Sequence, residues 1–205
     1  MAQALPKWVE DYIAAVPESA LIRGMFFRWV DEFCAVNDLI PPAEKRIDFK
    51  FYPTTDFLYY LCWGLQPLAT EVGYEQALRQ MGQFIYDSFR KTILGRSVFS
   101  GVLSLRSLLK VGPRAYHMLL DDSAEVEVTF PNDHEAHVSL EGVWVFNDTL
   151  GVGTWEGVLT GYGVEGAVDI VKSNQRDGIS LRIRWEPKEK KRSLSGLFSS
   201  DGSKL

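Results

Sequence analysis

The chain has 205 residues, of which 46% are hydrophobic and 13% aromatic, so it has enough apolar material to form the core of a globular protein. Its 27 acidic and 22 basic side chains leave a net charge of -5, which excludes a general electrostatic attraction to nucleic acid or to an anionic membrane. The start of the chain is too polar for a signal peptide, no transmembrane run is present, and Cys34 and Cys62 are too few for a disulfide scaffold. We therefore expect a cytoplasmic protein without a nucleic-acid partner or an integral membrane segment, with both thiols in its core.

Apolar residues three and four positions apart predict amphipathic helices through the first half of the chain. One of them begins near Thr54, and Pro67 is expected to kink or end it because proline lacks a helical hydrogen-bond donor. The pair Gly112-Pro113 is expected to separate two shorter helices. Besides the helix from Thr54, the predicted helices cover residues 7–16, 19–36, 73–94, 98–110 and 113–120.

Near Ser123 the hydrophobic period changes to two, which is typical of strands with one buried face. The stretch "AEVEVTF" and a segment at about 136–146 predict one hairpin, and "AVDIVKS" with "ISLRIRW" predict a second. A short helix is predicted between the hairpins, at about 150–161. The predicted fold class is therefore α+β, in which an N-terminal helical half is followed by hairpin, helix and hairpin that form a four-stranded antiparallel sheet.

This pattern indicates one domain over residues 1–187, with a helical part at 7–121 and a sheet part at 123–187. The remaining residues, 188–205, are basic and then rich in serine and glycine. Because they carry too little apolar surface to pack, we expect a disordered tail.

The stretch "GYGVEG" (161–166) matches the G-x-G-x-x-G pattern of dinucleotide-binding loops. That pattern binds phosphate only where it follows a strand and opens a helix, because the phosphates contact amides at the helix N-terminus. Here it closes a predicted helix and leads into a strand. We therefore expect Gly161 or Gly163 to supply a left-handed helix cap, and we expect no nucleotide to bind here.

No recognised catalytic motif is present, so we expect neither an enzyme nor a cofactor. His134 and His137 form an H-x-x-H pair, but strand positions three apart point to opposite faces, so we expect a solvated turn and no metal site. His117 has no nucleophile motif beside it and is expected to be a partly buried structural residue. Residues 79–114 combine many basic side chains with one carboxylate, Asp87, and form either a solvated face or a contact for an acidic ligand or protein partner.

Aromatic residues are dense in the first third of the chain, and the helix that contains "FLYYLCWGL" is apolar on every side. Its outer face must therefore meet another helix, a second subunit or a ligand. One interpretation is an apolar pocket between helices and sheet, with Phe26, Trp29, Tyr59 and Trp63 as ligand-binding residues. The other is core and dimer packing, with Tyr60 and Trp63 at an interface with a second subunit.

Several stretches resemble an uncharacterised family of proteins of about this length that occurs as many paralogous copies in myxobacteria. The order of elements is also similar to that of the superfamily of haem-dependent nitric-oxide sensors, vinyl-reductase-type domains and TRAPP subunits. The stretches that carry the family resemblance are "LIRGMFFRWV", "FYPTTDFLYYL", "GYEQALRQMGQFIYDSF", "ILGR", "FNDTLGVGTWEGVLTGYG" and "LRIRWE".

The resemblance implies a ligand-binding architecture without an assigned reaction. Haem sensors of this architecture use an axial histidine and a Tyr-x-Ser-x-Arg motif, whereas the nearest string here, "VLSLR", has Val102 in place of the tyrosine. Vinyl-reductase-type domains often carry cysteines in the C-terminal half, and Cys62 is the last cysteine here. We therefore expect a non-enzymatic regulatory module that binds an apolar small molecule, without haem or metal. The alternative is a protein-interaction scaffold that acts as a homodimer without a small ligand.

Overall fold

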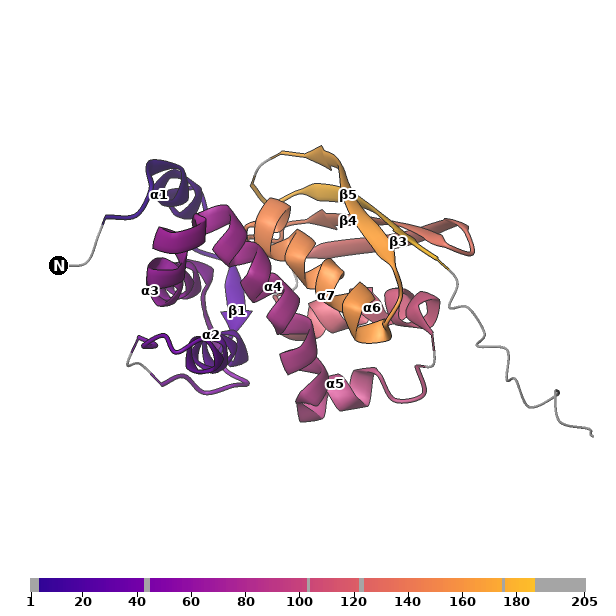
Figure 1. Ribbon diagram of the computed structural model, residues 1–205, viewed down its shortest axis with the longest axis horizontal. Coiled ribbons are helices and arrows are strands. Elements are labelled where there is room, and N and C mark those ends of the chain that lie inside the picture. The colour runs from indigo at the N-terminus through magenta and orange to yellow at the C-terminus, as the bar shows by residue number, and fades with distance from the viewer. Residues whose placement is uncertain (1–3, 43–44, 103, 122–123, 175, 187–205) are drawn as a thin grey trace, which may run out of the picture.

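Helices with a small two-stranded sheet form one side of the structure and a four-stranded sheet forms the other, with α4 (Tyr74–Lys91) and α7 (Val152–Tyr162) between them (Figure 1). This computed structural model describes residues 4–42, 45–102, 104–121, 124–174 and 176–186. It confirms the predicted α+β fold with the helical half first. The other elements in chain order are α1 (Lys7–Ala14), β1 (Leu21–Arg23), α2 (Met25–Val36), β2 (Phe51–Pro53), α3 (Thr54–Val72), α5 (Ile93–Val98), α6 (Leu105–Leu119), β3 (Glu125–Asn132), β4 (Glu135–Glu141), the π-helix η1 (Asn147–Gly151), β5 (Gly166–Ser173) and β6 (Ile179–Trp185).

The four-stranded sheet is antiparallel throughout and has the order β3-β4-β6-β5, as two hairpins joined side by side require. Val138 of β4 lies opposite Val128 of β3 on one side and Leu181 of β6 on the other. Alternate residues of β4 and β6 are buried, and α6 and α7 contact the two edge strands, β3 and β5. The opposite face is charged, and Asp169 pairs there with Arg184 (Oδ2 to Nη2, 2.8 Å).

One predicted boundary in the N-terminal half is wrong, and of the two outcomes expected at Pro67 the helix end is excluded. The helix predicted at 19–36 begins only at Met25, because Leu21–Arg23 are extended as β1 and pair with β2. Pro67 does not end its helix, since α3 continues past it. The carbonyl that Pro67 leaves without a helical donor belongs to the exposed Trp63, where water can bind it, so the missing hydrogen bond is tolerated.

The predicted pair of short helices before the sheet is also wrong. α6 begins at Leu105 and runs unbroken across Gly112-Pro113. Ser104 sets its start, because its hydroxyl oxygen accepts a hydrogen bond from Ser107 N (3.1 Å). Gly112 lets the helix continue into Pro113, since glycine has no Cβ that would collide with the proline ring.

Glycines determine how closely α4 and α7 approach each other. Gly153 and Gly157 lie on the backbone of α4, and a Cβ at these positions would overlap the carbonyls of Arg79 and Gln83 respectively. Gly161 continues the same face of α7, four residues further on. This contact gives the glycine-rich stretch "GVGTWEGVLTGYG" its structural reason.

The stretch "GYGVEG" ends α7 as predicted. Gly163 has φ 59 and ψ 41, the left-handed conformation of a helix C-cap, and its N–H donates to Thr160 O (2.8 Å). The chain then enters β5. The order is therefore helix, cap and strand, which is the reverse of a phosphate-binding loop.

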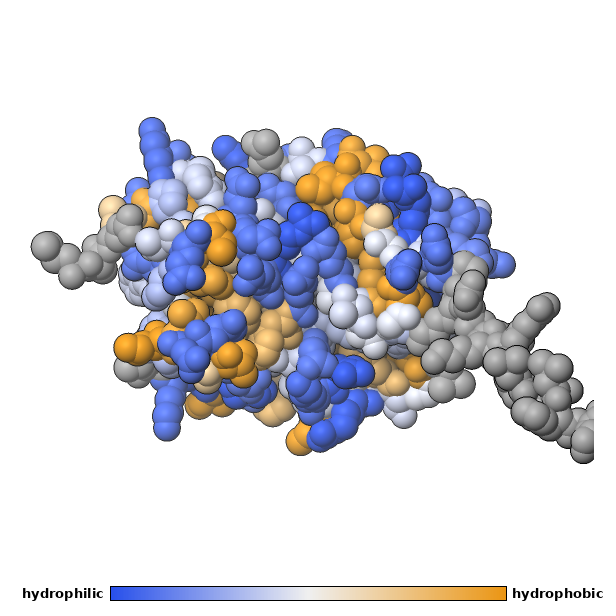
Figure 2. All heavy atoms as spheres, in the orientation of Figure 1, coloured by the Kyte–Doolittle hydropathy of each residue, from blue (hydrophilic) through white to orange (hydrophobic). Residues whose placement is uncertain are grey.

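Figure 2 shows a mainly hydrophilic face with apolar surface over β5 and over the N-terminal helices. The exposed apolar side chains include Ile170 and Val171 in β5. Within the described ranges, none of the helices is both long and apolar enough to cross a bilayer. The tail predicted to be disordered, 188–205, lies outside the described residues.

Candidate functional site

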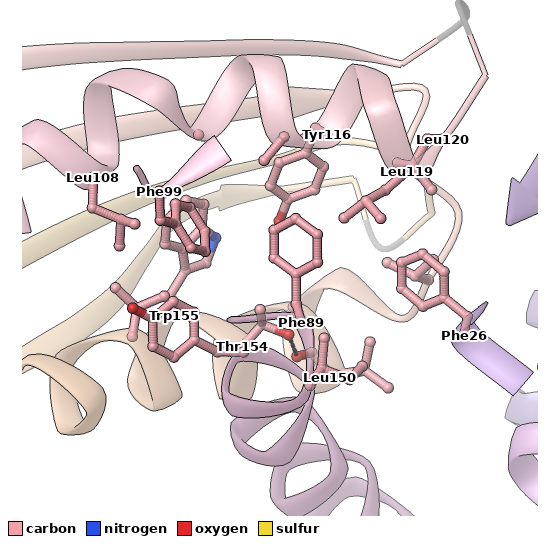
Figure 3. Close-up of a pocket in the computed structure, with 17 residues that line it drawn as sticks. Phe26, Phe89, Phe99, Leu108, Tyr116, Leu119, Leu120, Leu150, Thr154 and Trp155 are labelled. Carbon is pink, nitrogen blue, oxygen red and sulfur yellow. Dashed lines mark hydrogen bonds between the residues drawn. The ribbon is translucent and has the colours of Figure 1, made fainter. Parts of the chain in front are cut away.

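An apolar cavity of about 90 Å³ lies where α4, α6, α7 and η1 meet (Figure 3). Aromatic and aliphatic side chains form almost all of its wall, and they come from segments far apart in the sequence. The lining residues are Phe26 from α2; Ile85, Tyr86 and Phe89 from α4; Phe99 after α5; Leu108, Gly112, Ala115, Tyr116 and Leu119 from α6; Leu120 and Val145; Leu150 and Gly151 from η1; and Thr154, Trp155 and Val158 from α7.

Small residues on α6 leave the space for this cavity. Gly112 and Ala115 lie in the same helical stripe as Leu108 and Leu119, at spacings of three and four. A Cβ at Gly112 would still be 3.6 Å from Trp155 Cη2, an ordinary contact distance. This wall was not predicted, because the predicted helices at 98–110 and 113–120 were separated at Gly112-Pro113. Small residues within one apolar stripe were the signal that could have indicated it.

Two hydrogen-bond donors in the wall lack partners. The indole nitrogen of Trp155, Nε1, is buried and has no hydrogen-bond partner among the described residues. Tyr116 stacks on the same ring, with centroids 6.2 Å apart. Burial is the one cause that raises the pKa of Tyr116 far above its ordinary value, so no hydrogen bond or neighbouring charge stabilises its phenolate. Figure 3 shows its hydroxyl directed toward the ring of Phe89, inside the pocket. A buried unpaired donor is costly, so Trp155 Nε1 favours a ligand that accepts a hydrogen bond, and the Tyr116 hydroxyl offers a second donor to such a ligand.

The cavity adjoins a strained turn. β4 ends at Glu141, short of the predicted 146, because the chain turns at Gly142 (φ 69). Phe146 has a left-handed backbone (φ 54) that is rare for a residue with a side chain, and it leads into the π-helix η1. The Tyr12 hydroxyl holds this conformation by accepting from Phe146 N (2.9 Å), and the two rings stack at 4.3 Å. Strain of this kind is common at functional sites.

A larger hollow, of about 680 Å³, lies between α1, α3, α4 and η1. Its wall is mostly polar, whereas ligand sites are mostly apolar with a few placed polar groups. The cavity beside Trp155 has a mostly apolar wall with a few polar groups, and it is therefore the candidate site.

The four residues predicted to bind a ligand are not brought together. Phe26 lines the cavity. Trp29 does not line it but packs against the Phe26 ring, with ring centroids 4.7 Å apart. Tyr59 and Trp63 stack on each other at 5.6 Å on the outer face of α3, 37% and 53% exposed, and line no part of the cavity. Positions 59 and 63 share this outer face because they are four residues apart, while Phe57 and its buried neighbours point inward.

Of the two predicted interface residues, Trp63 alone is accessible. Tyr60 is 4% exposed, and its hydroxyl lies 2.6 Å from Asp31 Oδ1 and 2.5 Å from Pro42 O. These contacts place the Tyr60 side chain inside the N-terminal block, so it cannot face a second subunit.

The three histidines lie on the surface. His117 is exposed on α6, contrary to the predicted partial burial. His134 and His137 flank the β3–β4 turn, where His137 Nε2 lies 2.8 Å from Glu135 Oε1. In the part of the chain that the structure describes, no group of three or more His, Cys, Asp or Glu side chains could hold a metal ion.

The basic stretch 79–114 divides between several neighbours. The Arg79 guanidinium binds Glu156 (Nε to Oε2, 2.8 Å) and thereby lowers the pKa of that carboxyl. Arg106 pairs with Asp133 and lies over the ring of Phe130. The stretch is therefore not one uniform solvated face.

A family model described as "Protein of unknown function (DUF2378)" matches residues 16–186, so the chain belongs to that family. No curated protein matches the chain in sequence. Solved structures do match its fold. An H-NOX protein from S. oneidensis in the Fe(II) ligation state has a TM-score of 0.63 at 12% identity, over 82% of this chain and 98% of that one. A mutant H-NOX of T. tengcongensis has a TM-score of 0.60 at 14% identity, over 81% and 98%. An oxygen-binding H-NOX domain related to soluble guanylate cyclases has a TM-score of 0.57 at 14% identity, over 81% and 96%.

These likenesses confirm the haem-nitric-oxide-sensor architecture expected from the sequence, and at such low identity they show the fold alone. One matched structure is described as probing haem distortion in the H-NOX family. The residues here do not fit haem. Among the described residues that line the cavity, none is a histidine, cysteine or methionine that could ligate iron. Tyrosine ligates haem iron as the phenolate, and burial raises the pKa of both Tyr86 and Tyr116, which disfavours that form. The cavity of about 90 Å³ is also smaller than the ~300–1,000 Å³ of pockets for larger ligands.

Proposed function

We propose that this member of the DUF2378 family is a non-enzymatic, cytoplasmic sensor module that binds a small apolar molecule in the cavity between α4, α6, α7 and η1. The fold of proteins whose descriptions name bound iron, nitric oxide or oxygen supports a ligand-binding role. The cavity wall supports a mainly apolar ligand, because almost all of its lining is apolar.

The observation that carries the proposal is the unpaired indole nitrogen of Trp155. A buried donor without a partner costs stability, typically ~1–3 kcal/mol, and an acceptor atom of a ligand in the adjoining cavity would remove that cost. A ligand with one acceptor atom would satisfy Trp155 or the nearby hydroxyl of Tyr116 while its apolar part filled the cavity.

The position of the cavity suggests how binding would be sensed. The end of α6, which lines the cavity, is tied to β1 by hydrogen bonds from Arg23 Nε to Met118 O (2.8 Å) and from Leu21 N to Asp121 Oδ2 (2.6 Å). On the other side, η1 follows the strained Phe146. A ligand that shifts α6 or relaxes this turn would thereby change the N-terminal block, whose surface is free for a partner protein.

Native mass spectrometry of the purified protein, with organic extraction, tests the proposal. We expect a reproducible extra mass that denaturation releases. The Ala115→Leu variant fills the cavity and should lose this mass, and Ala115→Met serves where leucine prevents folding. Ala14→Leu adds the same atoms at an exposed position and should keep it. If the wild-type protein shows only the bare polypeptide mass under every condition tested, the proposal is contradicted.

A second candidate is a homodimeric interaction scaffold without a small ligand. The exposed stack of Tyr59 and Trp63 favours it, because large aromatic side chains on a surface are enriched at protein interfaces. A dimer through this face is compatible with ligand binding, since the cavity lies on other elements.

A further inference from the structure

We infer that the ligand is a small amphipathic carboxylate, whose apolar body occupies the cavity and whose carboxylate is bound by Arg90 and Arg96 in a recess beside it. This inference rests on the proposed function of the cavity and adds the chemical class of the ligand.

The recess and the cavity share a wall. The recess has a volume of about 390 Å³ and is lined by residues from α4, α5 and α7. Tyr86 and Phe99 line both spaces, and no other described residue is common to the two linings. Phe99 stands at the C-cap of α5 and meets Phe89 edge-on, with centroids 5.4 Å apart. The rings of Tyr86 and Phe99 contact each other, with centroids 6.1 Å apart, and so separate the cavity from the recess. A ligand that spans both spaces therefore requires one of these two rings, such as that of Phe99 outside the helices, to turn aside.

The recess carries positive charge that the protein does not neutralise. Arg90 pairs with Asp87 (Nη2 to Oδ1, 2.8 Å), but the same carboxylate also binds Lys91 (Oδ2 to Nζ, 2.5 Å). Arg96 donates to the carbonyl of Lys91 (Nη1 to O, 3.0 Å) and has no carboxylate partner among the residues that the structure describes. Two cations thus share one carboxylate while Arg96 has none, and an anion is the complementary ligand.

Two further features indicate a carboxylate on an apolar body. Arginine presents paired N–H donors that match the two oxygens of a carboxylate, and charge-assisted bonds of this kind are stronger than neutral ones. The adjoining cavity accepts only apolar groups of limited size: an engineered apolar cavity of roughly 150 Å³ holds benzene, so the cavity of about 90 Å³ here suits a short alkyl chain, or one ring where side chains of the wall move aside. A purely polar anion would leave this space unfilled.

Isothermal titration calorimetry with matched probes tests the inference. The probes are 3-phenylpropionate with 3-phenylpropanamide, and hexanoate with hexanamide, so that each pair differs in charge and keeps its apolar body. We expect each carboxylate to bind wild type about tenfold more tightly than its amide, because an added charge-assisted bond is worth about that ratio.

The variants separate the head group from the body. Arg96→Gln and Arg90→Gln should each weaken the carboxylates about tenfold and leave the amides unchanged. Arg114→Gln removes one positive charge from an exposed position on α6 outside the recess and should change neither. Ala115→Leu should weaken all four probes, because it fills the space for the body.

Each alternative result has one meaning. Equal binding of carboxylates and amides, abolished by Ala115→Leu, would overturn the head-group inference and leave the proposed function standing. An equal loss in Arg114→Gln and Arg96→Gln would show attraction by overall charge and would also overturn it. Failure of all four probes to bind wild type would contradict this inference, while the extra mass expected above tests the proposed function on its own.

Discussion

The contact of α4 with α7 predicts opposite effects for the same substitution at two glycines. Gly157→Ala adds a Cβ that overlaps the backbone carbonyl of Gln83, and backbone can move away only if the two helices separate. Gly151 is also helical, with φ -61 and ψ -49, but a Cβ there would meet Asn147 Oδ1 at 3.5 Å, an ordinary contact. The first change should destabilise the protein and the second should stabilise it.

The expected sizes follow from two opposing effects. Replacing glycine by alanine in a helix is favourable by ~0.5–1 kcal/mol, because the unfolded chain loses freedom. Overpacking typically costs ~1–3 kcal/mol, so Gly157→Ala should lower the free energy of unfolding by about 1–2 kcal/mol. For a chain of this size that corresponds to a fall in Tm of roughly 2–8 °C. Gly151→Ala should gain about 0.5–1 kcal/mol and raise Tm by roughly 1–4 °C.

Urea unfolding followed by circular dichroism measures both variants. The comparison is valid where the urea dependence, m, equals that of wild type, since a changed m would mean a changed native or unfolded state. A Gly157→Ala variant as stable as wild type would refute the close approach of α4 and α7. If Gly151→Ala lowers the free energy of unfolding as much as Gly157→Ala does, the claim that the space around each glycine decides whether alanine stabilises or destabilises is refuted.

Three further predictions concern charge, thiols and assembly. Hydrogen bonding to Arg79 lowers the pKa of Glu156, so this pair stabilises the fold above the ordinary pKa of glutamate and the contribution is lost as pH falls through the lowered value. Glu156→Gln should therefore cost about 0.5–1 kcal/mol at pH 7 and progressively less as the pH falls through that lowered pKa, as measured by urea unfolding across the acid range; a loss that does not change with pH would contradict the ion pair. Burial raises the pKa of Cys34 to about 11 and of Cys62 to about 12, so both thiols should react with Ellman's reagent at pH 8 far more slowly in the folded protein than in urea, and equal rates would refute their burial. Trp63→Glu should yield a folded monomer by light scattering if the outer face of α3 forms a dimer, whereas a folded variant that stays dimeric would exclude Trp63 from the interface.

The fold was largely predictable because each half of the chain has a clear hydrophobic period. The alternation in "ISLRIRW" gave β6, and the change of period near Ser123 separated helices from sheet. The helix predicted to break at Gly112-Pro113 continues, and so does the helix that Pro67 was expected to kink or end, because packing of the apolar stripe outweighs the local preference.

The site was less predictable, because its wall depends on how distant helices pack. Of the residues predicted to bind a ligand, Phe26 lines the cavity, while Tyr59 and Trp63 lie outside it. Aromatic density indicated an apolar surface but could not distinguish a buried face from an exposed one. The decisive residues, Gly112 and Ala115, are small and carry no chemical signal of their own.

The most direct test of a ligand cavity beside Trp155 is the ¹H–¹⁵N spectrum of the indole groups during titration with benzene, a neutral probe for apolar cavities. The chain has 6 tryptophans, and Trp155→Phe and Trp63→Phe assign the two signals needed. We predict that the Trp155 signal shifts saturably while that of the exposed Trp63 stays unchanged, and that Ala115→Leu abolishes the shift. A Trp155 signal that does not respond, or a Trp63 signal that responds as strongly, would contradict the account.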